Sequence, residues 1–187
     1  MKRFIDDYRD ESFDIIVIGG GITGAAVAYD AASRGLRVAL VEKRDFGCAT
    51  SAATSKVIHG GLRYLKTFEF GLVRESLSER RIMENIAPNF VYPMRFMFIN
   101  PKFDMKIGLH VYDLLAYDKQ FTWDRSKKIP NNYGLSRDEV IREEPNVKRD
   151  GLKGARVFYD CQCISPERLT LTFIKSAVHY GARVSKR

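Results

Sequence analysis

The stretch DIIVIGGGITGAAVAYDAASRGLRVALVE, residues 14–42, decides the fold class of this chain. Its first six residues, DIIVIG, form the β-branched run typical of a strand that is buried on both faces of a parallel sheet. The alanine-rich segment that follows predicts a small-faced helix with Gly35 as its stop, and residues 36–42 predict a second buried strand. A strand, a tight turn, a helix and a parallel strand make up the right-handed crossover unit of α/β proteins.

Three glycines between the first strand and the helix follow the pattern G-x-G-x-x-G, at Gly19, Gly21 and Gly24. In dinucleotide-binding units the first permits the tight turn, the second lets a pyrophosphate touch the backbone, and the third lets helix and strand pack closely. Glu42 ends the second strand, where an acid accepts hydrogen bonds from an adenosine ribose and disfavours a 2′-phosphate. The pattern predicts dinucleotide binding, against the alternative of a glycine-rich turn without a ligand. It leaves FAD and NAD both open.

Composition and charge restrict the class of protein. With 45% apolar and 29% charged residues, the 187-residue chain is typical of one soluble globular domain and not of a disordered one. The net charge of +8 is uneven, because residues 1–50 carry 7 basic and 8 acidic side chains and residues 51–187 carry 24 and 15. This excess suits an anionic small substrate or an anionic membrane surface. Nucleic acid is not an expected partner, since no nucleic-acid-binding signature accompanies the dispersed Lys and Arg.

The character of the first residues and the number of cysteines favour a reducing compartment. Residues 1–13 form a polar, acidic extension that resembles neither a signal peptide nor a transit peptide. The apolar run at 15–29 is too short and too glycine-rich to span a bilayer. The cysteine count is odd, which without a secretory signal favours reduced thiols. Cys161 and Cys163 form a C-x-C without a partner pair nearby, so we expect ordinary thiols and no metal.

Several elements are predicted in the middle of the chain. Residues 71–88 predict a helix, and a capping box of Ser136 and Glu139 predicts the start of another. Residues 154–160 predict a strand. Residues 100–133 are expected to be irregular, although His110 and its neighbours favour a helix. The basic, aromatic part of this segment is expected to be a solvated loop, with a membrane-surface segment as the alternative.

The last predicted helix has Ser165 as its N-cap, Pro166 at its first position and Gly181 as its stop. Another strand is expected to begin after Gly181. Since two parallel strands are not stable alone, this strand should join them. We therefore expect the N-terminal part of a dinucleotide-binding domain at 14–187 that is incomplete at its C-terminus, with an inserted helical and irregular region at about 66–153. The apolar face of the helix is predicted from four residues: Leu169, Phe173, Ala177 and Tyr180.

A resemblance to a known family decides between the dinucleotides. The small and hydroxyl residues of CATSAATSKVIHGGLRYL, residues 48–65, followed by GLVRESLSERRIMENIAPNFVYPMRFMF, resemble the FAD-dependent glycerol-3-phosphate dehydrogenases. The related α-glycerophosphate oxidases share the pattern. The segments KIGLHVYDLLA, LSRDEVIREEPNVK and LKGARVFYDCQCISPERLTLTF also fit, so the resemblance covers the chain from residue 14 onward. It implies an α/β fold, a Rossmann-like FAD/NAD(P)-binding fold that is incomplete here, with the start of an α+β substrate or cap region.

The resemblance implies FAD as the cofactor. A flat ring system packed against the backbone requires small residues, while hydroxyl and N–H groups satisfy its polar edge. The positions that match the family's cofactor-binding pattern are Gly19, Gly21, Thr23, Gly24, Glu42, Thr50, Ser51, Ser55, Gly60, Gly61 and Leu62.

The same resemblance implies a substrate site. Arg63 and Tyr64 match positions that contact glycerol 3-phosphate, and the planar fork of an arginine suits a phosphate. His59 becomes a candidate catalytic residue for proton handling. From the residues alone, Arg63 and Tyr64 are more typical of a surface pair, and His59 of a residue that bonds to its local backbone. Further catalytic residues are expected beyond residue 187.

The implied activity is oxidation of sn-glycerol 3-phosphate to dihydroxyacetone phosphate by hydride transfer to flavin N5, with a quinone as electron acceptor. The alternatives are an oxidase that uses O2, another flavin oxidoreductase acting on an amine or amino acid, or an inactive N-terminal fragment. A cytoplasmic protein is expected, with peripheral binding to the inner face of the cytoplasmic membrane and a homo-oligomer both open.

Overall fold

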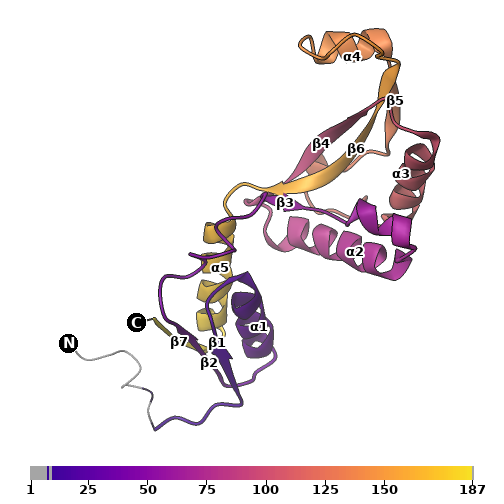
Figure 1. The fold of residues 1–187 in the computed structure, drawn as a ribbon. Coiled ribbons are helices and arrows are strands. Elements are labelled where there is room, and N and C mark those ends of the chain that lie inside the picture. Colours follow the sequence, from indigo (N-terminus) through magenta and orange to yellow (C-terminus); the bar gives the residue numbers. More distant parts are fainter. Residues whose placement is uncertain (1–7, 9, 187) are drawn as a thin grey trace. The chain divides into compact units, whose positions relative to one another are not determined.

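The computed structural model describes residue 8 and residues 10–186, so most of the expected extension at 1–13 lies outside the described residues. The chain divides into two compact units (Figure 1). The first consists of the residues up to Lys56 together with those from Ser165 onward, and the second is the continuous segment Val57–Ile164.

The first unit is built on a parallel sheet of the strands β1 (Ile15–Ile18), β2 (Val38–Glu42) and β7 (Arg183–Lys186), in the order β1-β2-β7. In its register Val17 lies opposite Leu40, and Leu40 lies opposite Val184. The predicted strand, helix and strand are confirmed, and so is the third strand at the end of the chain. This is the partial Rossmann-like arrangement that the glycine motif predicts.

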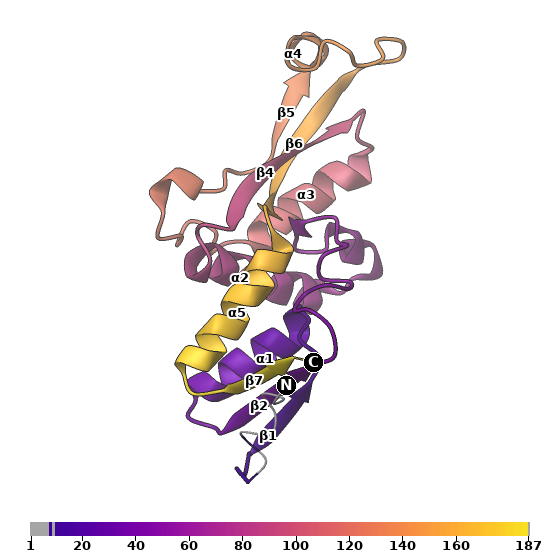
Figure 2. The same ribbon diagram turned by 90° about the vertical axis from the view of Figure 1, so that its left-hand side faces the viewer.

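Helices α1 (Ile22–Ser33) and α5 (Pro166–His179) pack side by side on one face of this sheet (Figure 2). Both helices end as expected, because Gly35 and Gly181 adopt left-handed φ angles of 85° and 97°. The next residue in each case donates its N–H back into the last turn, a Schellman motif. The core beneath the helices contains Val17, Ala25, Ala28, Ala31, Ala32, Val38, Leu40, Ile174, Ala177 and Ala182.

Two sequence predictions for this unit are wrong in detail. Strand β1 is covered on one face only, because both helices lie on the same side, so Ile16 and Ile18 are 64% and 87% exposed. The buried face of α5 agrees with the predicted one at Leu169, Phe173 and Ala177, and it differs at two positions. It includes Ile174, whereas Tyr180 follows the helix as its C-cap and is exposed. Ser165 occupies the N-cap position, but its side chain makes no capping bond.

The second unit is built on an antiparallel sheet whose central strand is β6 (Gly154–Cys163). Strand β4 (Val91–Ile99) pairs along its whole length with β6. Strands β3 (Val57–Ile58) and β5 (Tyr133–Ser136) also pair with β6, β3 near its C-terminal end and β5 at its N-terminal end. The predicted strand at 154–160 is confirmed and is longer than expected. Strand β4 was not among the predicted elements.

Helices α2 (Phe70–Ile86) and α3 (Phe103–Leu115) cover one face of this sheet (Figure 1). The predicted helix at 71–88 is α2. Part of the expected irregular segment 100–133 is the regular helix α3, because Leu109 and Tyr112 bury one helical face against Phe158. The ring of Phe158 stacks on those of Phe96 and Phe98, with centroids 5.2 and 5.1 Å away.

The remaining helices are short. The 3-10 helices are η2 (Leu62–Thr67) and η3 (Arg125–Lys127), and α4 (Arg137–Glu143) begins at the predicted capping box. The Ser136 hydroxyl accepts the N–H of Glu139, and the Glu139 carboxylate accepts the N–H of Ser136. None of the helices in the described part of the chain is long and apolar enough to cross a bilayer.

Candidate functional site

The expected site residues divide between the two units, since residues 19–55 belong to the first and residues 59–64 to the second. In the first unit the turn from β1 to α1 needs its glycines. Gly19 has a φ of 109°, in the region that side chains rarely adopt. A Cβ on Gly24 would lie 2.0 Å from the carbonyl oxygen of Gly19, so helix and strand could not pack as they do. Gly21 differs, because a Cβ there would meet only the Ser51 hydroxyl at 3.4 Å.

Glu42 lies beside this turn. One carboxylate oxygen accepts the N–H of Gly20 at 2.7 Å, and the other accepts the N–H of Arg44 at 2.7 Å. The bond from Gly20, followed by the one from Arg44, lowers the pKa of Glu42 from its usual range. The carboxylate is thus ionised and held at the turn. A carboxylate has about four acceptor positions, so it keeps capacity for a ribose hydroxyl.

Of the expected hydroxyl residues, the structure brings Ser51 to the glycine turn. Its buried hydroxyl accepts the N–H of Ile22, the first residue of α1, at 2.9 Å. Thr23, Thr50 and Ser55 are exposed. The first-turn N–H groups of a helix lack intrahelical acceptors and carry partial positive charge, which suits a pyrophosphate. Glycines without side chains, an ionised acid and a helix N-terminus therefore fit a dinucleotide.

In the second unit, His59 to Tyr64 lead into η2 through a glycine pair. Gly61 is left-handed, with a φ of 68°, and a Cβ on Gly60 would lie 2.4 Å from Leu77 and 2.6 Å from the Tyr112 hydroxyl. Both glycines are buried. The backbone is therefore packed tightly against α2 and α3, and the excluded side chain at Gly60 would clash with protein atoms.

His59 forms a local bond, as the residue-based interpretation suggests. Its Nδ1 accepts the N–H of Gly61 at 3.0 Å. A ring nitrogen that accepts a hydrogen bond carries no proton, so the neutral imidazole bears its proton on Nε2. In this arrangement His59 is a hydrogen-bond donor at Nε2.

Arg63 and Tyr64 form the pair that the sequence suggests. The Arg63 guanidinium donates to the Tyr64 hydroxyl at 2.9 Å and lies 4.8 Å from the centre of its ring. Within the described residues no carboxylate lies at salt-bridge distance from Arg63. Its charge is thus oriented by Tyr64 and available to an anion.

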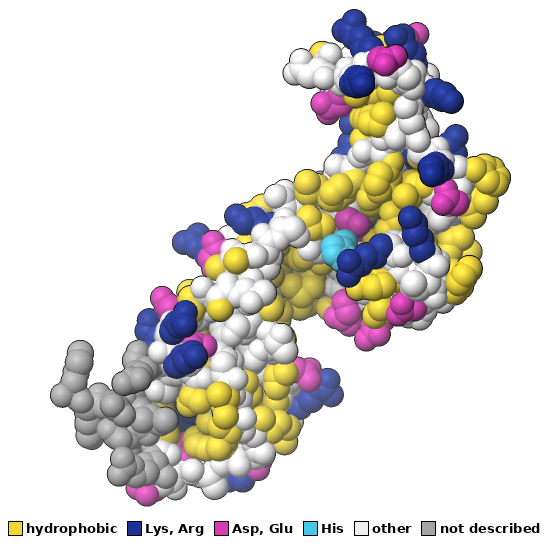
Figure 3. Space-filling model, viewed as in Figure 1, with side chains coloured by type: hydrophobic (Ala, Val, Ile, Leu, Met, Phe, Trp, Pro, Cys, Tyr) yellow, Lys and Arg dark blue, Asp and Glu magenta, His cyan; other side chains and the backbone are white. Residues whose placement is uncertain are grey.

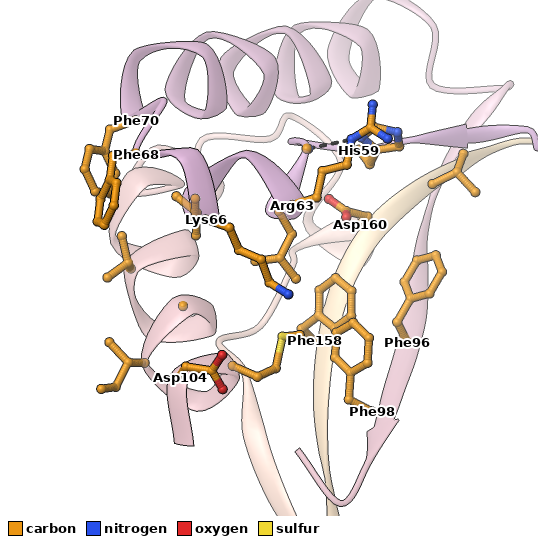
Figure 4. A pocket seen from close by; sticks show the side chains of 18 residues that line it. His59, Arg63, Lys66, Phe68, Phe70, Phe96, Phe98, Asp104, Phe158 and Asp160 are labelled. Atoms are coloured by element: carbon orange, nitrogen blue, oxygen red, sulfur yellow. Dashed lines mark hydrogen bonds between the residues drawn. The ribbon is translucent and has the colours of Figure 1, made fainter. Parts of the chain in front are cut away.

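A cavity of about 950 Å³ is lined by His59 and Arg63, whereas Tyr64 is not among its lining residues (Figure 4). His59, Arg63 and Lys66 come from the segment around η2, and Asp160 comes from β6. The apolar wall combines aromatic side chains with aliphatic ones such as Leu62, Met105 and Val111. Hydrophobic side chains also gather on the surface of this unit, with cationic ones among them (Figure 3). A cavity with an apolar wall and a few converging charges is the usual form of a small-molecule site. The aromatic residues lining it are Phe68, Phe70, Phe96, Phe98 and Phe158.

Sequence reasoning missed both acidic residues that line this cavity, Asp104 of α3 and Asp160 of β6. Asp160 is 4% exposed and accepts hydrogen bonds from the Tyr112 hydroxyl and from Arg80. An acid that follows the hydrophobic run of a buried strand was the available signal. Arg80 and Tyr112 had none, since both lie in ordinary amphipathic helices.

A family comparison agrees with the glycine turn. Residues 14–187 match the sequence profile described as FAD dependent oxidoreductase. The chain belongs to this family. Among curated members of the FAD-dependent oxidoreductase family, glycerol-3-phosphate dehydrogenase of Mycobacterium leprae is 43% identical over 183 residues, and aerobic glycerol-3-phosphate dehydrogenase of Bacillus subtilis is 41% identical over 186. These alignments cover 95% and 96% of this chain but only 30% and 32% of the relatives.

Solved structures of FAD-dependent oxidoreductases share the fold. Glycerol-3-phosphate dehydrogenase of Bacillus halodurans, complexed with FAD, matches with a TM-score of 0.68 and 27% identity, over 98% of this chain and 28% of its own. The FAD-bound L-α-glycerophosphate oxidase of Mycoplasma pneumoniae matches with a TM-score of 0.67 and 21% identity, over 94% and 45%. The chain thus spans about a third of the curated relatives.

Proposed function

We propose that the protein carrying this chain oxidises sn-glycerol 3-phosphate to dihydroxyacetone phosphate with FAD as its cofactor. The observation that carries the proposal is the 41–43% identity to proteins named glycerol-3-phosphate dehydrogenase over nearly the whole chain. FAD, when bound, supplies the acceptor for the hydride from C2 of the substrate. The chain's own residues bind and orient the cofactor and the substrate.

The proposed cofactor contacts in the first unit follow from the glycine turn. The backbone at Gly21 and the N-terminus of α1 face the pyrophosphate, and Glu42 accepts from the adenosine ribose. Ser51 holds the start of α1 and so fixes the direction of its N–H groups. From the family pattern, Thr23, Thr50, Ser55 and the backbone of residues 60–62 complete the proposed set.

The proposed substrate contacts lie at the cavity of the second unit. Arg63 binds the phosphate, because its guanidinium is exposed, oriented by Tyr64 and without a carboxylate among the described residues. His59 donates a hydrogen bond from Nε2 to a substrate oxygen in the arrangement described. The base that removes the C2 hydroxyl proton is not assigned to a described residue.

Two finer points, the electron acceptor and the location in the cell, belong to this proposal. The electrons pass to a quinone, with O2 as the alternative. The protein lies at the inner face of the cytoplasmic membrane, where the basic excess after residue 50 would meet anionic lipid.

The second candidate function is oxidation of an amine or amino acid. It is favoured by the fold alone, through glycine oxidase and L-proline dehydrogenase structures with TM-scores of 0.58 and 0.66.

The test uses the longest gene product that carries these residues. Its absorption spectrum is recorded, glycerol 3-phosphate is added without oxygen, and then a soluble quinone analogue or O2 is admitted to separate parallel samples. Flavin bands that bleach with glycerol 3-phosphate support the proposal, and the acceptor that restores them identifies the electron route. Bands that persist with glycerol 3-phosphate but bleach with an amine or amino acid would establish the second candidate. A product without flavin bands would contradict both.

A further inference from the structure

The glycine pair next to His59 is held by a chain of buried hydrogen bonds. The N–H of Gly60 donates to the Tyr112 hydroxyl at 2.7 Å and makes a longer, second contact to Oδ1 of Asp160 at 3.4 Å. The Tyr112 hydroxyl donates to the same Oδ1 at 2.7 Å. Arg80 donates to the same oxygen at 2.5 Å. Arg80 and Tyr112 are 2% exposed and Asp160 is 4% exposed. The chain therefore runs from α2 through β6 and α3 to the backbone of Gly60.

The direction of each bond in this chain is determined. Arg80 is always charged and can only donate, and an ionised Asp160 can only accept. The Tyr112 hydroxyl has a single proton, which it donates in the hydrogen bond to Asp160, so a lone pair of its oxygen accepts the N–H of Gly60. The ion pair thus sets the orientation of a neutral hydroxyl, and that hydroxyl sets the position of a backbone amide.

A second buried acid is kept from competing for Arg80. Glu84 is 1% exposed, and both of its carboxyl oxygens lack a hydrogen-bond partner among the described residues. Burial raises the pKa of Glu84, against the opposing effects of Cys161, Arg80 and Lys127. A second negative charge beside Arg80 is thereby disfavoured, and the ion pair that Arg80 forms among the described residues is with Asp160.

This arrangement is costly for stability alone. Two charges must be taken out of water, Nε of Arg80 remains unpartnered within the described residues, and apolar side chains of similar volume would often serve as well. What the polar chain provides, and apolar packing does not, is a defined position for the Gly60 N–H. Gly60 directly follows His59, and Arg63 lies two residues after Gly61, in the first turn of η2. Asp160 itself lines the same cavity as His59 and Arg63 (Figure 4).

We propose that Arg80, Asp160 and Tyr112 are positioning residues that fix the Gly60–Gly61 turn and thereby hold His59 and Arg63 at the cavity. The effect on catalysis rests on the proposed function. The effect on the turn does not, since it depends only on the bonds described. Tyr112 is the residue whose change isolates the effect, because Tyr112→Phe removes one oxygen and keeps the aromatic ring in the core.

The experiment compares Tyr112→Phe with Tyr92→Phe in the longest gene product that carries these residues. Tyr92 lies on β4 and is 40% exposed, so its substitution controls for loss of a phenol hydroxyl outside the network. Amide hydrogen exchange of peptides covering residues 57–65 and 166–179 is measured by mass spectrometry. Loss of one buried bond predicts exchange about tenfold faster at 57–65 in Tyr112→Phe, and unchanged exchange at 166–179. Tyr92→Phe should leave both peptides unchanged.

Kinetics provide the second measurement. With glycerol 3-phosphate, Tyr112→Phe should lower kcat about tenfold and change KM less than about threefold, because orientation and not binding is disturbed. Wild-type exchange at 57–65, or equal acceleration in both peptides, would overturn the positioning role. If the unsubstituted protein does not oxidise glycerol 3-phosphate, the proposed function fails, while the exchange experiment still decides the inference about the turn.

Discussion

Alanine substitutions at Gly24 and Gly21 should separate what the glycine turn does for the fold from what it does for the cofactor. A Cβ on Gly24 would lie 2.0 Å from the carbonyl oxygen of Gly19 and 3.2 Å from Val17. Because ordinary contacts begin near 3.4 Å, helix and strand would have to separate by more than about 1 Å. We expect Gly24→Ala to lower the free energy of unfolding by about 3 kcal/mol.

Gly21→Ala should behave differently. A Cβ at Gly21 would lie 3.4 Å from the Ser51 hydroxyl, an ordinary contact, and the φ of −75° suits alanine. Stability should fall by no more than about 1 kcal/mol, because Gly21 is the N-cap of α1, a position that disfavours alanine relative to glycine. If a pyrophosphate touches this backbone, an added methyl should cost about 1–3 kcal/mol of binding, which raises the FAD Kd roughly ten- to hundredfold.

The assays are urea unfolding followed by circular dichroism and FAD binding followed by flavin fluorescence. Gly71→Ala is the matched control, because nothing lies within 4 Å of a Cβ at this helical position. It should stabilise slightly and leave FAD binding unchanged. Wild-type stability of Gly24→Ala would refute the close approach of α1 to β1. Unchanged FAD affinity of Gly21→Ala would refute the approach of the pyrophosphate.

Three other substitutions test separate features. Arg63→Ala should raise the KM for glycerol 3-phosphate at least about a hundredfold in steady-state kinetics. Arg63→Lys should recover only part of the loss, because a lysine cannot bind a phosphate with a planar fork. An unchanged KM in Arg63→Ala would disprove the phosphate role. Since burial raises the pKa of Glu84 above its usual 4.5, the folded chain binds that proton more tightly than the unfolded one, and stability should decline as pH rises above about 4.5. Glu84→Gln should reduce this decline in urea titrations at pH 5 and pH 8, and an identical decline in the variant would contradict the assignment. Ser136→Ala should cost about 1 kcal/mol in the same urea assay, since the capping box with Glu139 is lost, and no change would show that the cap contributes nothing.

The first unit was largely predictable because its signals are local. Buried parallel strands need β-branched runs, and the two helices end at glycines whose left-handed backbone the sequence marks at Gly35 and Gly181. Exposure was not predictable from the same residues. Ile16 and Ile18 have the character of buried positions, but whether a second layer covers them depends on which face the helices choose.

The second unit was less predictable because its elements depend on distant partners. In α3, Gly108 and alternating apolar residues obscure the helical period, and the helix is stabilised by packing of Leu109 and Tyr112 on Phe158. Strand β4 is defined by pairing along β6, which no local pattern encodes. The same reason explains the candidate site. The family resemblance implied Arg63 and Tyr64, whereas no local pattern indicates Asp160, which the pairing of β6 brings to the cavity.

The order of the two units along the chain has a consequence for synthesis on the ribosome. Strand β7 pairs with β2, so the first unit closes its sheet only when the last residues of the described chain are made. The second unit is continuous and is complete before α5 and β7 appear. Because chains emerge from the N-terminus, the inserted unit can fold while β1, α1 and β2 still wait for their third strand. The glycine turn is therefore translated early, whereas the strand β7 that pairs with β2 is translated only after the second unit.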